Sequence, residues 1–176
     1  KHWTFIPEDK YEGRTGGKDG VNYQQFADYL EITPGNVTDY NYVKAKMFEL
    51  CEKYQVQSIA YDRWNSSQLV IECIEEGLKM SAFGMGYKSL SPAAKEIESK
   101  VMTGDFIYFN DPVVRWQFGN VQLETDPAGN IKPNKAKSSD KIDTIMAMCM
   151  AVGEEMYSEA PVVSKYKRDN KGFFTI

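Results

Sequence analysis

Two acidic residues in different surroundings are the strongest candidates for chemistry in this chain. Asp62 follows the apolar run 56–61, and this pattern predicts a carboxylate at the carboxyl end of a buried strand. Asp143 lies within the apolar segment 141–147, which predicts a carboxylate in the first turn of a helix. An α/β fold places reactive groups at such ends, because the scaffold is rigid there and the loops leave room for a ligand. Two carboxylates brought together in this way could hold a divalent metal ion.

Four lysines lie close to Asp143 in the sequence: Lys132, Lys135, Lys137 and Lys141 fall within ten residues. Beside a metal site they predict a phosphate as the ligand, and they are candidates for contacts with a nucleic-acid backbone. The formal net charge of the chain is −4, from 21 basic and 25 acidic residues. Because the basic residues are clustered, this total is weak support in either direction for a nucleic-acid partner.

Each of these residues also has a purely structural interpretation. Asp62 could be a turn aspartate that caps the segment after it. Asp143 could be an ordinary first-turn acid, since carboxylates near a helix amino terminus interact favourably with the helix dipole. The lysines could be a solvated loop. In favour of a site, Ile142 and Ile145 flank Asp143 on a strongly apolar helix, which predicts that the acid is drawn toward the interior.

The composition limits the other kinds of site. The single histidine, His2, argues against zinc sites and Ser-His-Asp triads. Cys51, Cys73 and Cys149 fall at apolar positions of predicted helices without metal-ligand or disulfide spacing, which predicts buried free thiols in a reducing cytoplasm. No segment comes near the roughly 18 consecutive apolar residues of a membrane span. Any chemistry is therefore expected from carboxylates and lysines.

The chain is long enough at 176 residues for one domain with a substantial core. Strands are predicted at 3–7, 30–32, 56–61, 80–83, 107–109 and 121–125, and helices at 38–54, 65–77, 91–103, 111–118 and 140–156. This alternation of strands and helices predicts an α/β fold with at least partly parallel pairing. We assign residues 1–157 to the domain and residues 158–176 to a polar tail or arm.

Several stretches together resemble one family, the nuclease domain of the large terminase subunit of tailed bacteriophages and prophages. In order, these stretches are 5–8 (FIPE), 32–40 (ITPGNVTDY), 59–64 (IAYDRW), 89–96 (SLSPAAKE), 115–121 (RWQFGNV), 129–135 (GNIKPNK) and 141–143 (KID). The resemblance covers the chain from about Trp3 to Gly153. It rests on seven matches in the family's order, since no single stretch is decisive.

The resemblance implies a ribonuclease-H-like fold, with a mixed central sheet flanked by helices. It implies that Asp62 and Asp143 bind two Mg²⁺ or Mn²⁺ ions about 3.5–4 Å apart and cut double-stranded DNA. It also implies that the protein acts in the bacterial host cytoplasm, with the small terminase subunit and the portal protein as partners in the full motor.

The sequence departs from the family's pattern in two places. The family's first catalytic Asp lies on a first strand that would precede Lys1, and no phosphate-binding loop of an ATPase domain is found. We therefore expect this chain alone to cut DNA weakly or not at all. A resolvase- or transposase-like nuclease is an alternative, as is a non-catalytic terminase-derived module that binds DNA or a procapsid. Chelator-sensitive nicking of supercoiled plasmid would separate an enzyme from such a module.

Overall fold

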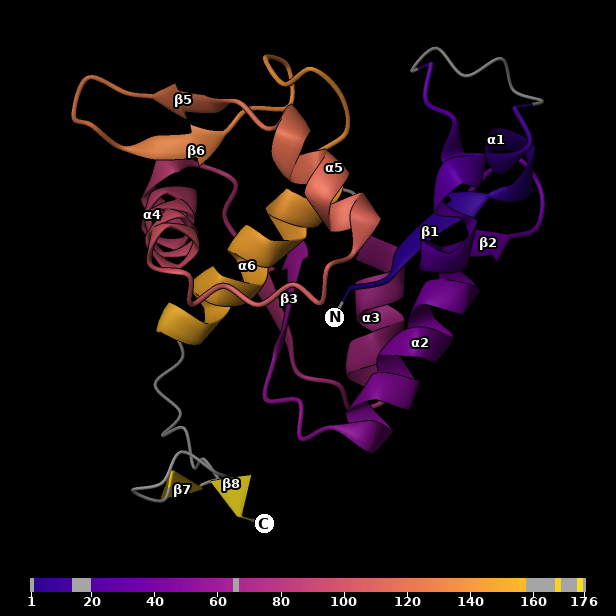
Figure 1. Ribbon diagram of the computed structural model, residues 1–176. Coiled ribbons are helices and arrows are strands. Elements are labelled where there is room, and N and C mark those ends of the chain that lie inside the picture. The colour runs from indigo at the N-terminus through magenta and orange to yellow at the C-terminus, as the bar shows by residue number, and fades with distance from the viewer. Residues whose placement is uncertain (1, 14–19, 65–66, 158–166, 169–173, 176) are drawn as a thin grey trace.

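The computed structural model describes residues 2–13, 20–64, 67–157, 167–168 and 174–175 (Figure 1). The first half contains β1 (Thr4–Pro7), α1 (Glu8–Tyr11), the 3₁₀ helix η1 (Tyr23–Tyr29), β2 (Leu30–Thr33), α2 (Tyr40–Lys53), β3 (Ile59–Asp62), α3 (Ser67–Glu75) and β4 (Met80–Phe83). The second half contains α4 (Tyr87–Thr103), α5 (Pro112–Asn120), β5 (Leu123–Thr125), β6 (Ile131–Pro133), α6 (Asp143–Tyr157), β7 (Lys167–Arg168) and β8 (Phe174–Thr175). The expected mixture of strands and helices is confirmed.

The described strands form four separate pairs. β1 pairs with β2 and β3 pairs with β4, both in parallel, whereas β5–β6 and β7–β8 are antiparallel. Partly parallel pairing is thus confirmed. A single central sheet is not formed by these residues, because no described strand bonds to members of two different pairs.

The core lies where α6 packs against α4 and the β3–β4 pair. Its buried side chains are Phe83, Leu90, Ala93, Ala94, Ile97, Ile142, Ile145, Met146 and Cys149. Figure 1 shows α6 in the middle of this layer, with α4 on one side and α5 above its first turns. Because three elements bury apolar side chains against α6, this helix fixes the position of everything attached to its ends.

Helix starts that depend on a local cap follow the sequence prediction. Asp39 accepts a hydrogen bond from the Asn41 amide at 2.9 Å and begins α2. Asp111 accepts from the amides of Val113 and Val114 and begins α5 with Pro112 in its first turn. Both carboxylates satisfy amides that have no partner inside the helix.

The predicted start of α4 at Ser91–Pro92 is wrong. The helix begins at Tyr87, so Pro92 lies inside it. Pro92 has no amide to donate to the Lys88 carbonyl, and the Tyr157 hydroxyl donates to that carbonyl instead, at 3.3 Å. The Ser91 hydroxyl accepts from the Ile131 amide at 3.1 Å, which attaches β6 to α4. The side chain at the predicted helix start is thus used in a tertiary contact.

The predicted strand at 107–109 is also wrong. These residues belong to an irregular segment between α4 and α5, in which Phe109 and Asn110 have left-handed φ angles of 54° and 55°. In the tail, the residue pairs of β7 and β8 are strands, and the rest of 158–176 lies outside the described residues. No helix in the described ranges has the length and apolarity to cross a bilayer.

The cysteines should differ in reactivity. Cys73 and Cys149 are buried and Cys51 is half-buried. Burial raises the pKa of Cys149 to about 11 and also raises the pKa of Cys73. Because the thiolate is the reactive form, a thiol reagent at pH 8 should label Cys51 first and the other two only on unfolding. Cys51→Ala should remove the fast phase, and a fast phase of two thiols would contradict this.

Gly153 should be essential for the close packing of α6 against Phe83 of β4 and Ala93 of α4. A Cβ at this position would lie 2.4 Å from Phe83 Cζ and 3.5 Å from Ala93 Cβ. Gly153→Ala should therefore lower the free energy of unfolding, since overpacking costs about 1–3 kcal/mol and the helix propensity of Ala returns only about 1 kcal/mol. Gly119→Ala in α5, with open space around it, is the matched control and should be neutral or stabilising. Denaturant titration of both variants measures the difference.

Candidate active site

Asp143 is the first residue of α6, and α5 holds the start of this helix. The Thr144 amide donates to Oε1 of the buried Gln117 at 2.6 Å, and Asn120 Nδ2 donates to the Lys141 carbonyl at 3.1 Å. The helix begins three residues after the start predicted at residue 140. The segment that carries Asp143 is therefore tied to a second helix by two hydrogen bonds.

Asp62 is the last residue of β3, opposite Phe83 of β4. Side chains alternate along a strand, so Asp62 lies on the same face as Ala60, and Ala60 packs against the core cluster that includes α6. The Asp62 carboxylate also accepts from the Trp64 amide at 3.2 Å. This hydrogen bond confirms the interpretation of Asp62 as a turn aspartate. Its position on the α6 side of the strand is also compatible with a role as a metal ligand.

Glu154 fixes the direction of α6 relative to the strands. Its carboxylate accepts from Ser58 Oγ at 2.6 Å and from Ser81 Oγ at 2.8 Å. Ser58 precedes β3, so the second half of α6 lies at the amino end of that strand. In Figure 1, β3 and α6 run in opposite directions. Asp62 and Asp143 consequently lie toward the same end of this helix–strand layer.

Lys132, Lys135 and Lys137 form ion pairs with described carboxylates. Lys135 Nζ lies 2.5 Å from Asp143 Oδ1, and both side chains are about 60% exposed, with values of 60% and 62%. Lys137 and Lys132 lie 3.3 Å and 3.7 Å from the Glu124 carboxylate. Lys135 thus meets the candidate catalytic acid, whereas Lys132 and Lys137 are directed to a different one.

Lys141 is the fourth lysine and occupies a different setting. Its amide donates to Asp140 Oδ1 at 2.7 Å, and the residue lines the large cavity described below. It therefore lies beside Asp143 in the wall of that cavity.

Asn134 orders the loop that presents these lysines. Its Oδ1 accepts from the amides of Ala136 and Lys137, and its Nδ2 donates to Glu124 at 2.9 Å. Hydrogen bonds from Lys137 and Asn134 hold the pKa of the Glu124 carboxyl below its usual value. Neither Asn134 nor Glu124 was predicted from the sequence. Glu124 reaches the lysines through the β5–β6 register, which pairs it with Lys132.

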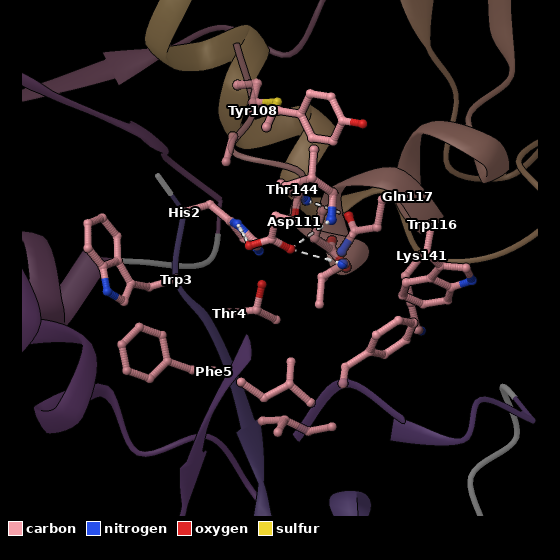
Figure 2. Close-up of a pocket in the computed structure, with 18 of the residues that line it drawn as sticks. His2, Trp3, Thr4, Phe5, Tyr108, Asp111, Trp116, Gln117, Lys141 and Thr144 are labelled. Atoms are coloured by element: carbon pink, nitrogen blue, oxygen red, sulfur yellow. Dashed lines mark hydrogen bonds and ion pairs between the residues drawn. The ribbon is translucent and has the colours of Figure 1, made fainter. Parts of the chain in front are cut away.

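A cavity of about 810 Å³ opens beside Asp143, between β1 and the helices α5 and α6. Figure 2 shows His2, Thr4 and Phe5 on one side and Asp111, Gln117 and Lys141 on the other. His2 Nδ1 lies 3.1 Å from Asp111 Oδ2. Burial lowers the pKa of His2, although Asp111 acts in the opposite direction. Asp143 and Lys141 line this cavity, whereas Asp62 is not among its lining residues.

The donor chemistry of the two acids suits a hard divalent cation. Carboxylate oxygens are the ligands that Mg²⁺ and Mn²⁺ prefer. Within the described ranges, no group of three His, Cys, Asp or Glu side chains is placed to hold a metal ion. Asp62 and Asp143 can thus contribute ligands, and a two-ion centre would need at least one more.

A family model and two known relatives match most of this chain. Residues 1–159 match the sequence model of the terminase large subunit, endonuclease domain. The chain is 34% identical over 126 residues to the terminase large subunit of Enterobacteria phage HK97, covering 70% of this chain and 25% of that protein. It is 26% identical over 162 residues to protein YmfN of Escherichia coli (strain K12), covering 88% of this chain and 36% of that protein.

A structural relative gives the same result. The crystal structure of the HK97 bacteriophage large terminase matches with a TM-score of 0.74 and 32% sequence identity, over 85% of this chain and 32% of that chain. The chain therefore spans about a quarter to a third of the length of its relatives. The resemblance found in the sequence is confirmed, and the chain belongs to the family of terminase large subunit endonuclease domains.

Proposed function

We propose that this domain is a metal-dependent endonuclease that cleaves concatemeric double-stranded DNA during genome packaging, with Asp62 and Asp143 as catalytic metal ligands in a ribonuclease-H-like fold. The observation that carries the proposal is the placement of Asp62 and Asp143 on packed, oppositely directed elements, toward one end of the layer. The family membership supports the same assignment. In the full motor we expect the small terminase subunit and the portal protein as partners, in the host cytoplasm.

The residues of the chain would divide the work as follows. Asp62 and Asp143 would hold Mg²⁺ or Mn²⁺, which when bound activates a water molecule and neutralises charge on the leaving oxygen. The Gln117–Thr144 hydrogen bond would keep Asp143 in position, and Glu154 would keep α6 in register with β3. Lys135 balances the Asp143 charge at one edge, where phosphates of the substrate would pass.

A non-catalytic role is the second candidate, and one observation favours it. Within the described ranges, no three His, Cys, Asp or Glu side chains are grouped to hold a metal ion. A domain with an incomplete ligand set could still bind DNA or a procapsid. A resolvase- or transposase-like nuclease is less favoured, because the family match spans residues 1–159.

Replacing either candidate acid should remove metal binding. Asp62→Asn and Asp143→Asn should each abolish Mn²⁺ binding in a calorimetric titration and any chelator-sensitive nicking of supercoiled plasmid. The melting temperature should change little or rise, because removing a clustered negative charge relieves repulsion. Asp28→Asn, an exposed acid in η1, is the control and should behave as the unchanged chain.

The outcome also tests the ligand count. We expect weak cleavage or none from this chain, because Mg²⁺ tolerates incomplete coordination badly. Robust cutting by the 176 residues would show that another acid, such as Asp126 or Asp140, completes the set. Unchanged Mn²⁺ binding in both Asn variants would refute the assignment of Asp62 and Asp143.

The lysine loop should contribute to DNA binding despite its ion pairs. Exposed ion pairs contribute about 0–1 kcal/mol, so DNA phosphates can compete with Glu124 and Asp143 for Lys137 and Lys135. The double variant Lys135→Ala and Lys137→Ala should weaken duplex binding and lower the slope of log K against log salt by about two. An unchanged slope would leave the loop as solvated surface.

A further inference from the structure

A second groove lies next to the cavity that Asp143 lines. It has a volume of about 490 Å³ and is lined by Gln25, Phe26, Tyr29, Asn110, Pro112, Arg115 and Trp116. Phe26 and Trp116 line both spaces, and their ring centroids are 5.3 Å apart. This aromatic pair therefore forms a wall between the groove and the candidate active site.

Arg115 differs from the lysines of the candidate site in its partners. Its Nη2 donates to the Tyr108 hydroxyl at 3.4 Å and to Asn110 Oδ1, and both acceptors are neutral. Lys132, Lys135 and Lys137 are each paired with a carboxylate. No described carboxylate forms an ion pair with Arg115. Its positive charge is consequently not neutralised, and its remaining N–H groups can meet an anion.

The backbone on this side of the groove is in an uncommon conformation. Phe109 and Asn110 have left-handed φ angles of 54° and 55°, and neither is glycine. Strain of this kind collects at ligand-binding positions, where the surrounding structure maintains it. Here the conformation accompanies the position of Asn110, which holds the guanidinium at the groove.

The groove also contains an exposed aromatic side chain. Tyr29 lines it and is 46% exposed. An exposed ring beside an arginine is the combination with which proteins bind single-stranded nucleic acid, since bases stack on the ring and the guanidinium contacts the backbone. Arginine binds phosphate with two parallel hydrogen bonds.

The groove is mechanically connected to the candidate active site. Arg115 and Trp116 precede Gln117 on α5, and Gln117 holds the Thr144 amide next to Asp143 at 2.6 Å. A strand bound at Arg115 would thus be held by the same helix that positions the first turn of α6.

We propose that this groove binds a locally unpaired DNA strand beside the cleavage site, with Arg115 on a backbone phosphate and the Tyr29 ring stacked on a base. The inference rests on the proposed function, because it requires DNA as the ligand. It assigns DNA binding to a residue outside the lysine loop.

The test measures binding of a labelled single-stranded oligothymidine and a blunt duplex by fluorescence anisotropy, without divalent metal, over a range of salt. Arg115→Ala should weaken single-strand binding and lower the salt slope by about 0.7. Arg115→Lys should keep the slope but bind more weakly, because an ammonium lacks the planar fork. Tyr29→Ala should lose about fivefold or more on the single strand, whereas Tyr29→Phe should retain binding.

Lys79→Ala is the matched control. Lys79 is exposed and precedes β4, at the opposite end of that strand from Phe83. Equal effects of Arg115→Ala and Lys79→Ala would overturn the inference, as would equal binding by Tyr29→Ala and Tyr29→Phe. Failure of the unchanged chain to bind either DNA at low salt would instead contradict the proposed function. If Arg115→Ala weakened duplex binding and left single-strand binding unchanged, Arg115 would be a surface contact for duplex DNA, and the unpaired-strand assignment would be overturned.

Discussion

The close contact of α6 with the β3–β4 pair is the constraint on which the rest of the structure depends. Gly153 allows the Phe83 ring to approach the helix axis, and Glu154 receives hydroxyl hydrogen bonds from Ser58 and Ser81 on or beside both strands. Apolar burial alone would permit the helix to slide along the sheet, because the hydrophobic effect is not directional. The Glu154 hydrogen bonds specify one register. The position of Asp143 relative to Asp62 follows from that register.

Local signals in the sequence were sufficient where one side chain decides the outcome. Asp39 and the Asp111–Pro112 pair each set a helix start through a contact two or three residues away, and both starts were predicted. The start of α4 was not, because Ser91 bonds to Ile131 and the Pro92 gap is filled by Tyr157. Those partners are 40 and 65 or more residues distant in the sequence. The hydrophobic periodicity of a sequence holds no information about hydrogen bonds between residues so far apart.

The candidate site also combines residues that local sequence predicts with contacts that only the folded structure reveals. Asp62 and Asp143 could be selected from the sequence, since a strand end and a helix start are local patterns. That Lys135 pairs with Asp143, while Lys137 pairs with Glu124, depends on how the loop after β6 passes the end of α5 on its way to α6. Asn134 determines this turn with its own side chain. The lysine cluster was therefore recognised as basic, but the division of its charge between two acids required the structure.

This division of charge would allow an acidic chain to present the proposed surface for DNA. At physiological salt, charges interact over a Debye length of about 8 Å, so a polyanion responds to the local field rather than to the net charge of −4. Near Asp143, Lys135 offsets the charge of that carboxylate, whereas Lys132 and Lys137 offset the charge of Glu124. Arg115 forms hydrogen bonds with the neutral Tyr108 and Asn110 side chains and no ion pair with a described carboxylate. A cation bound by Asp62 and Asp143 would release part of the lysine charge, so metal binding and DNA binding should reinforce each other at this surface.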